Sequence, residues 1–195
     1  MFLSRDLLND ARPQEIMLPI TPFMEREGCC GPACLKMVLD YYGISKTEDE
    51  LIKLSGCIPE QGLPGQALLD AANQCGLEGR IQDRATLDDL QYIVNEKQIP
   101  AIVNWFPDND GHYSVTAGID EENVYLVDPD LGYLRALTRD LFQRLWFDFP
   151  GRDIKEPENL ILRWMIVLYP AQEESRVSER ERFRLRGGKG RRSSR

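Results

Sequence analysis

A cysteine stands at the first residue of a run that carries the signals of a helix. The run covers residues 30–43, in which Pro32 suits the first turn and Gly43 ends the helix. Apolar residues recur along it at helical spacing: Cys34, Met37, Val38 and Tyr41. A helix N-terminus offers free N–H groups and the positive end of the helix dipole, so it stabilises a thiolate, and Cys30 is a candidate nucleophile. Taken alone, the run fits a buried structural cysteine equally well.

The single histidine of the chain follows a polar turn and opens a predicted strand. His112 precedes the apolar segment 113–119, and a second predicted strand over residues 123–127 is followed by Asp128 and a proline. Two neighbouring strands joined by a short turn would bring His112 and Asp128 side by side. A thiolate needs a base, and the base needs an acceptor that orients it, so Cys30, His112 and Asp128 are predicted to form a catalytic triad. An ordinary histidine and an Asp-Pro turn are the alternative.

Together these motifs resemble those of the C39-like cysteine peptidases, papain-like relatives of the peptidases that remove double-glycine leaders from bacteriocins. The resemblance rests on Cys30-Gly31-Pro32-Ala33, Gly111-His112-Tyr113 and Val127-Asp128-Pro129, and it covers roughly residues 16 to 169. It implies an α+β, papain-like fold in which a helical half is followed by an antiparallel sheet half. It also implies a thiol-dependent peptidase that hydrolyses peptide bonds in the cleft between the halves, with Cys30, His112 and Asp128 as its triad.

The chain departs from this family at the position that supplies the oxyanion donor. The family has a glutamine five or six residues before the cysteine, whereas this chain has Glu25 and Met24 there. An ionised carboxylate only accepts hydrogen bonds, and losing one oxyanion donor typically costs ~100- to 1,000-fold in rate. Either Glu25 is protonated in a buried site, or it faces away while the Cys30 backbone N–H and another group bind the oxyanion. A catalytically weak or inactive peptide-binding module and an acyl transferase on the same triad are the alternatives.

Four residues near the predicted triad are expected to contact a peptide or protein substrate. Gly31 and Gly111 allow close backbone approach, and Tyr113 belongs to the histidine motif. Trp105 precedes the histidine turn and is predicted to line the substrate groove, with a core position as the alternative. No cofactor is expected, and no metal site, because Cys29, Cys30 and Cys34 are too crowded for a zinc site without a second pair of ligands.

Composition predicts one globular domain over residues 1–170 followed by a basic tail over residues 171–195. The chain has 195 residues, 42% of them apolar, and no apolar span or export signal. Five cysteines, an odd number, favour free thiols in the reducing cytoplasm, away from a membrane. Residues 176–195 carry a net charge of +7 and the rest carries −15, which argues against nucleic acid as a partner except for the tail. The tail is predicted to be disordered, and the oligomeric state is left open.

The pattern of elements places helices mainly before strands, which is typical of α+β domains. Capping boxes are predicted at Thr47-x-x-Glu50 and Thr86-x-x-Asp89. Besides the helix at Cys30, helices are predicted over residues 5–11, 48–54, 65–75, 87–98 and 139–146. Strands are predicted over residues 78–82, 100–105, 112–119, 123–127, 133–137 and 160–168.

Overall fold

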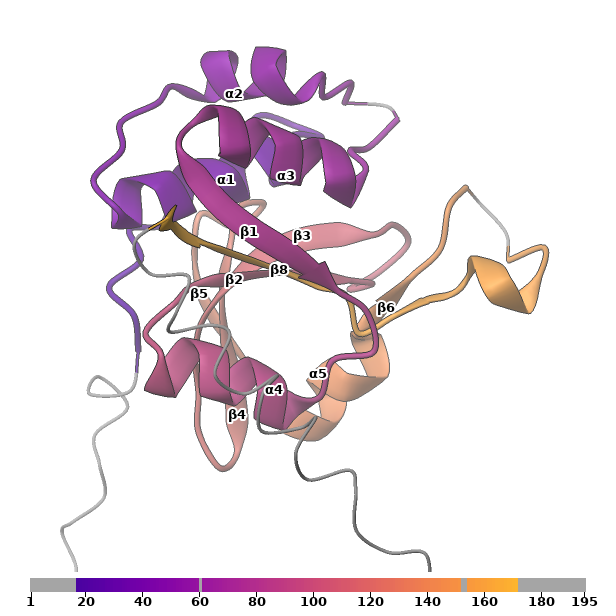
Figure 1. Ribbon diagram of the computed structural model, residues 1–195. Helices are drawn as coiled ribbons and strands as arrows, with labels where there is room; N and C mark the ends of the chain where they lie inside the picture. Colours follow the sequence, from indigo (N-terminus) through magenta and orange to yellow (C-terminus); the bar gives the residue numbers. More distant parts are fainter. Residues whose placement is uncertain (1–16, 60, 152–153, 172–195) are drawn as a thin grey trace, which may run out of the picture.

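The computed structural model describes residues 17–59, 61–151 and 154–171 (Figure 1). Its centre is a six-stranded sheet in the order β1-β8-β2-β3-β4-β5, in which every neighbouring pair is antiparallel. These strands are β1 (Leu77–Gln82), β2 (Ala101–Trp105), β3 (His112–Ile119), β4 (Asn123–Asp128), β5 (Tyr133–Thr138) and β8 (Met165–Pro170). A small second sheet pairs β6 (Phe147–Asp148) with β7 (Ile161–Leu162).

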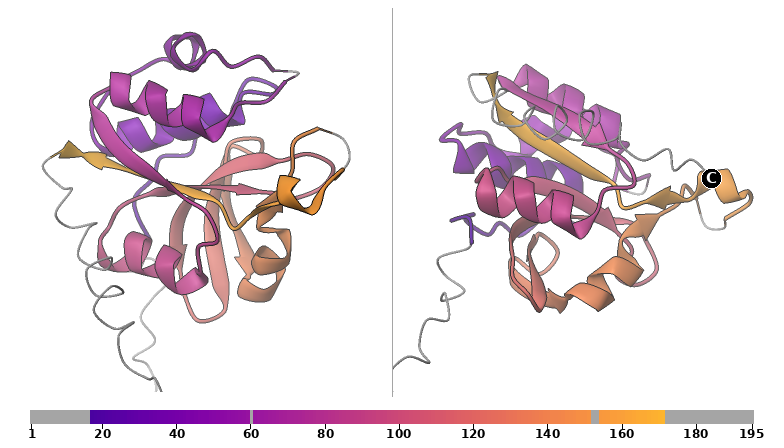
Figure 2. Two further views of the ribbon diagram at one scale, coloured as in Figure 1. Left: turned by 45° about the vertical axis from the view of Figure 1, so that its right-hand side comes forward. Right: turned by 60° about the horizontal axis from the view of Figure 1, so that its bottom comes forward.

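Helices cover the sheet from two sides (Figures 1 and 2). The first three helices form one layer: α1 (Cys30–Tyr41), α2 (Glu48–Ser55) and α3 (Gly65–Gln74). On the other side lie α4 (Leu87–Gln91), which continues as the π-helical turn η2 (Tyr92–Glu96), and α5 (Arg139–Leu145). A 3-10 turn, η3, covers Pro157–Asn159. The predicted α+β order of a helical half and an antiparallel sheet half is confirmed, with β1 added to the sheet edge beside β8.

Helix α1 is the rigid support of the chain's candidate nucleophile. Its side chains are buried on nearly every face, more than the predicted stripe requires, and six of them are fully enclosed: Ala33, Cys34, Leu35, Met37, Val38 and Leu39. Gly43 follows the helix with a φ of 75°, the left-handed conformation that glycine adopts without strain. Since α1 packs directly on β3, the start of the helix is fixed relative to the sheet.

Local signals placed most boundaries correctly, and both predicted capping boxes are confirmed. The predicted helix over 87–98 differs, because it widens into η2 after Gln91. There the side chain of Asn95 bonds to both backbone groups of Ile119, at the end of β3. This pairing ties the π-helical turn to the sheet, a contact between residues that are 24 positions apart.

The predicted strand over 160–168 is two strands, β7 and β8, which belong to different sheets. Arg163 breaks it with a φ of 51°, and the backbone of Trp164 turns toward Trp146, whose indole N–H donates to the Trp164 carbonyl at 2.9 Å. The partner strand of β7, the two-residue β6, carries no sequence signal and was not predicted. The predicted helix over 5–11 and the tail beyond residue 171 lie outside the described residues. None of the helices in the described ranges is both long and apolar enough to cross a membrane.

Substitution of Gly65 tests how tightly helix α3 packs against the Trp164 ring. A Cβ at this first residue of α3 would collide with the ring of Trp164. Alanine is the better helix former, yet we expect Gly65→Ala to lower the free energy of unfolding by about 1–3 kcal/mol, the usual cost of overpacking. Urea denaturation measures this, with Gln66→Ala on the exposed neighbouring position as the control. An unchanged or higher stability of Gly65→Ala would contradict the packing.

Candidate active site

The Cys30 thiol lies at the first residue of α1, half-buried. The residue before it, Cys29, makes no side-chain cap to the helix, and no acidic side chain lies in the first turn. The chain enters the helix through Gly28, whose φ is 74° and where a Cβ would lie 2.8 Å from the Pro59 carbonyl oxygen. Only glycine fits this turn. The backbone N–H groups at the start of the helix therefore stay available to an anion at Cys30.

The sheet brings His112 and Asp128 to the same place. His112 is the first residue of β3 and Asp128 the last of β4, and these strands are antiparallel neighbours. The His112 Nε2 atom lies 2.7 Å from Asp128 Oδ1, and the two side chains are only 14% and 2% exposed. The Cys30 thiol interacts with the other side of the ring and acts to raise the pKa of His112. Since Nε2 faces Asp128, the ring nitrogen left for Cys30 is Nδ1. All three residues of the predicted triad are thus in contact through the imidazole.

Charge at the site favours a protonated imidazole between two acceptors. Burial alone would lower the pKa of His112, but the hydrogen bonds to Asp128 and Cys30 raise this pKa to about 10. Burial acts to raise the pKa of Asp128, yet the hydrogen bonds from His112 and Arg135 outweigh it and lower that pKa. At neutral pH the Asp128 carboxylate therefore holds an imidazolium against the sulfur, the arrangement in which a cysteine is nucleophilic.

Arg135 is a member of this site that sequence reasoning missed. Its Nη1 donates to Asp128 Oδ2 at 2.8 Å, while the backbone N–H of Asp130 donates to Oδ1 at 3.1 Å. The guanidinium also lies over the Trp105 ring, 5.1 Å from the ring centre. A signal for it exists in the predicted β4–β5 hairpin: Arg135 pairs with Leu126, two residues before Asp128, so both side chains share one face of the sheet.

The prediction that Trp105 lines a substrate groove is wrong. Its side chain is fully buried, its indole N–H donates to Ser114 Oγ at 3.0 Å, and it packs edge-on against the His112 ring, to which it is the register partner. From its position on β2, the Trp105 side chain points into the core beneath the site. Trp105 therefore supports His112 and Arg135 from behind and cannot contact a substrate.

The other three predicted contact residues lie beside the triad but differ in exposure. Tyr113 is 7% exposed, and its hydroxyl donates to the Leu63 carbonyl at 2.9 Å. Gly31 is buried, and a Cβ there would lie 2.8 Å from the Leu63 side chain. Gly111 is exposed, and a Cβ there would collide with the Asp148 carboxylate. The segment around Leu63 thus closes one side of the site, and Gly111 is the predicted contact that is open to solvent.

Glu25, not Met24, is the residue that points inward at the oxyanion-donor position. Met24 is 63% exposed, whereas Glu25 is half-buried and its Oε2 atom is enclosed without a hydrogen-bond partner. The Glu25 backbone N–H donates to the Pro129 carbonyl at 2.9 Å, which anchors it beside the end of β4. Burial raises the pKa of Glu25 to about 7, and the charges of Asp130, Asp128 and Glu48 act in the same direction against that of His112.

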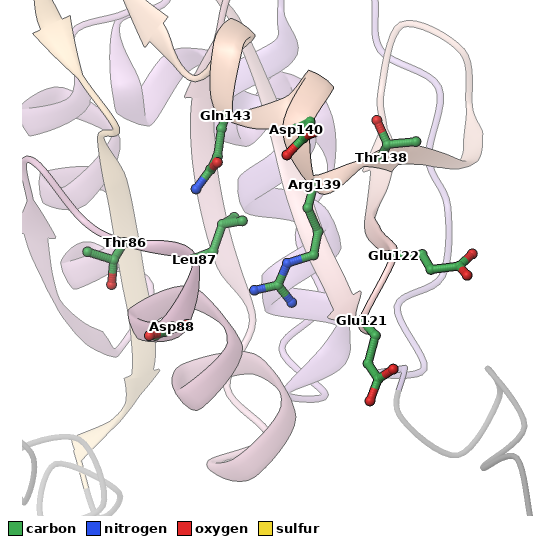
Figure 3. A pocket seen from close by; sticks show the side chains of 9 residues that line it. All are labelled: Thr86, Leu87, Asp88, Glu121, Glu122, Thr138, Arg139, Asp140 and Gln143. Atoms are coloured by element: carbon green, nitrogen blue, oxygen red, sulfur yellow. The ribbon is translucent and has the colours of Figure 1, made fainter.

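A separate polar pocket of about 660 Å³ lies between α4, the β3–β4 turn and the start of α5 (Figure 3). None of the predicted site residues lines it. Its lining residues are Thr86, Leu87, Asp88, Glu121, Glu122, Thr138, Arg139, Asp140 and Gln143. The Arg139 Nη1 atom donates to the Asp120 carbonyl at 2.8 Å, so this side chain joins the elements around the pocket. In the described part of the chain, no group of three or more His, Cys, Asp or Glu residues is placed to hold a metal ion.

The order of a helical half and an antiparallel sheet half defines a class, the papain-like fold of cysteine peptidases, and the three predicted triad residues lie at the start of α1, the start of β3 and the end of β4. Within this class the chain belongs to the Peptidase C39 family, whose model matches residues 23–149. The family resemblance seen in the sequence motifs is thereby confirmed.

Relatives of the chain include uncharacterized proteins and transport/processing ATP-binding proteins. An uncharacterized protein of Methanothermobacter thermautotrophicus is 36% identical over 123 residues, which are 62% of this chain and 78% of that protein. The transport/processing ATP-binding protein ComA of Streptococcus pneumoniae is 30% identical over 150 residues, 71% of this chain but only 20% of ComA. The match to ComA thus concerns one part of a much longer transporter.

Solved structures share the fold. The peptidase domain of Streptococcus ComA, a bi-functional ABC transporter, superposes with a TM-score of 0.64 at 24% identity and covers 77% of this chain and 98% of that domain. A double glycine motif protease from an AMS/PCAT transporter, solved with a leader peptide, gives a TM-score of 0.62 at 22% identity, with 80% and 94% covered. At these identities the superpositions establish the fold.

Proposed function

We propose that the chain is a thiol-dependent peptidase that uses Cys30, His112 and Asp128 to hydrolyse peptide bonds. The observation that carries this proposal is the His112 ring, which is hydrogen-bonded to Asp128 at 2.7 Å and whose pKa is raised by Asp128 and Cys30 together. Membership of the Peptidase C39 family supports the same chemistry. The free state of all five thiols supports a place in a reducing compartment such as the cytoplasm.

The proposed reaction follows from the two sides of the imidazole. The Cys30 sulfur attacks the carbonyl carbon of the scissile bond, and the carbonyl oxygen becomes an oxyanion. His112 gives its Nδ1 proton to the leaving amine as the C–N bond breaks, which leaves an acyl group on the sulfur. Water then attacks this thioester, with His112 as the base, and the acid product leaves the thiol. Asp128 holds the ring orientation throughout and stabilises the positive charge of the ring in the steps in which His112 is protonated.

A peptide segment is the substrate that this site would accept. One solved relative is a double glycine motif protease in complex with its leader peptide. An extended backbone is the substrate shape that we propose, with exposed Gly111 beside it and Leu63 on the side of Gly31 and Tyr113. We propose residues 1–170 as the peptidase domain and residues 171–195 as a separate basic tail.

The alkylation rate of Cys30 tests the triad without requiring a known substrate. We expect iodoacetamide at about pH 6 to modify Cys30 at least ~10-fold faster than Cys75, because the imidazolium of His112 holds the thiolate. Cys75 is a matched internal reference, since it is also half-buried and burial raises its pKa. Peptide mapping separates Cys30 from its buried neighbour Cys29.

The variant His112→Ala is the control for this measurement. It is expected to bring the Cys30 rate at about pH 6 down to that of Cys75. Equal rates at the two cysteines in the wild-type protein would show that the triad is not assembled and would contradict the proposed function.

A second function, peptide binding without hydrolysis, is favoured by one observation, the carboxyl of Glu25 where the family has an amide. An ionised Glu25 would repel an oxyanion. The two functions separate in the variant Glu25→Gln, since a binding module with an incomplete site would stay inactive after the amide is restored.

A further inference from the structure

The Glu25 carboxyl is half-buried, and one of its two oxygens is enclosed without a hydrogen-bond partner. This arrangement costs free energy when the carboxyl is ionised. Its Oε2 atom is buried and unpaired. An ionised oxygen in such a place forfeits its solvation with no compensating donor. A neutral carboxylic acid avoids most of this cost and gains an O–H that can donate. The protonation state of Glu25 therefore decides whether this position accepts or donates.

Charged groups from every neighbouring element act on this carboxyl. The β3 residue His112 presents a positive charge that lowers its pKa, and the end of β4 presents Asp128. The β4–β5 turn adds Asp130, and the start of α2 adds Glu48. Three carboxylates against one imidazolium, together with burial, leave the pKa of Glu25 near 7. Near neutral pH this group is thus poised between an acid that donates and a carboxylate that repels.

The backbone position of Glu25 places it next to the reacting atoms. Its N–H is bound to the Pro129 carbonyl at 2.9 Å, one residue beyond Asp128, and the chain from Glu25 reaches Cys30 through a single turn closed by the Cys29 N–H and the Arg26 carbonyl at 2.9 Å. Its carboxyl lies within electrostatic range of His112. The helix N-terminus at Cys30 and the Glu25 carboxyl, which is coupled to the neighbouring His112, are the two groups from which we expect donors to an oxyanion formed there.

We propose that Glu25 is a catalytic oxyanion donor that works only as a neutral carboxylic acid, so that acylation of Cys30 is confined to the pH range in which Glu25 keeps its proton. This inference rests on the proposed function. A glutamine in the same place would donate a hydrogen bond to the oxyanion at every pH. Glu25 donates this hydrogen bond only while it is protonated, so the peptidase is active at the lower pH values.

The protonated form of Glu25, which donates to the oxyanion, becomes more stable as the reaction proceeds. In the resting site the imidazolium of His112 lowers the pKa of Glu25. Once His112 has given its proton to the leaving amine, this opposing charge is gone, and Glu25 holds its proton more firmly in the acyl-enzyme. The developing oxyanion acts in the same direction, because negative charge nearby disfavours ionisation of a carboxyl group. Glu25 is therefore most strongly a donor in the steps that need one.

Two rate constants measured on the full chain separate this inference from the proposed function. Alkylation of Cys30 by iodoacetamide needs a thiolate but no oxyanion site. Acylation of Cys30 by p-nitrophenyl acetate, followed as p-nitrophenol release and corrected with Cys30→Ala, needs both. The ratio of acylation to alkylation, measured from about pH 5.5 to 8.5, isolates oxyanion stabilisation.

In the wild-type protein we expect this ratio to fall as pH rises through about 7, approaching ~10-fold per pH unit, because Glu25 loses the proton it donates. In Glu25→Gln the ratio should stay level, so that this variant exceeds wild type by at least ~10-fold at about pH 8.5. In Glu25→Ala it should be ~100-fold or more below wild type at about pH 5.5, since no donor remains.

The inference would be overturned if the ratio of acylation to alkylation had the same pH dependence in wild type and in Glu25→Gln. A Glu25→Ala ratio equal to that of wild type, or a Cys30 that is alkylated readily but not acylated at any pH, would also overturn it. These results leave alkylation of Cys30 dependent on His112, so the triad survives them. Failure of the triad appears instead in the alkylation rate itself, which would then not respond to His112→Ala.

Discussion

Replacement of His112 with alanine is expected to lower the rate of amide hydrolysis by on the order of 10⁴-fold or more. Two contributions are lost together. The imidazolium that stabilises the Cys30 thiolate disappears, and so does the proton donor for the leaving amine. Since His112 is the single histidine of the chain, no second imidazole can replace it.

These two contributions can be separated by the choice of substrate and pH. An activated ester such as p-nitrophenyl acetate expels a leaving group that needs no proton, whereas a peptide anilide does. At high pH, where a thiol ionises without help, His112→Ala should regain much of its ester acylation relative to wild type, but not its amide hydrolysis. The anilide acetyl-Leu-Arg-Gly-Gly-aminomethylcoumarin, which copies residues 185–188, serves as the amide substrate.

A direct spectroscopic readout accompanies the kinetics. The single histidine gives one pair of imidazole C–H signals in a proton NMR titration, and in wild type these signals should titrate near a pKa of about 10. Cys30→Ala removes a hydrogen bond and a charge that raise this pKa, so the titration should move to lower pH. A histidine that titrates identically in wild type and Cys30→Ala, or an amide activity that survives in His112→Ala, would contradict the mechanism.

The positions of the three residues proposed as the triad could be expected from the sequence because each carries a local signal. Cys30 stands where helix signals begin, Asp128 ends a strand before a proline, and a single histidine leaves no choice of base. The adjacency of β3 and β4 followed from their short connection, and the capping boxes at Thr47 and Thr86 fixed two helix starts. Short-range chemistry decided these features, so the folded structure reproduces them.

Features that depend on long-range pairing escaped prediction. The position of Trp105 before the histidine turn fits either a place beside the substrate or a place in the core, and the β2–β3 register decides for the core. The break at Arg163 arises because residues on either side join different sheets. Arg135 looks like an ordinary charged residue on an edge strand until the β4–β5 register brings it to Asp128. The sequence does not encode these contacts in any single segment.

The position of Arg135 leads to a second large prediction, on the Asp128 carboxylate. Its two oxygens receive three donors: His112 Nε2 and the Asp130 N–H on Oδ1, and Arg135 Nη1 on Oδ2. Asparagine at this position has one acceptor oxygen and one N–H group. If the oxygen faces Arg135, the N–H group faces His112 and forces its proton onto the nitrogen beside Cys30. We therefore expect Asp128→Asn to lower amide hydrolysis by ~10³- to 10⁴-fold, the size of the loss when a catalytic histidine is held in the wrong tautomer.

In Asp128→Asn, Arg135 should determine whether the oxygen or the N–H group of the asparagine side chain faces His112. Removal of Arg135 should therefore change the rate of amide hydrolysis in opposite directions in wild type and in Asp128→Asn. With Asp128 present, Arg135→Met removes one charge-assisted hydrogen bond and should lower amide hydrolysis by up to ~10-fold. With Asp128→Asn, the same Arg135→Met frees the asparagine oxygen to accept from His112 and Asp130, and hydrolysis should rise by ~10-fold or more. Methionine preserves packing over Trp105, so folding is not the variable that changes.

Arg135→Lys is the matched control, because it keeps the positive charge next to position 128. It should retain most of the wild-type activity and give no rescue of Asp128→Asn. The histidine NMR signal reports the same reversal, since the neutral tautomer of His112 should change when Arg135→Met is added to Asp128→Asn. If Arg135 merely stabilises the β4–β5 hairpin, Arg135→Met will lower activity in both backgrounds, and the assignment of Arg135 as a positioning residue for Asp128 fails.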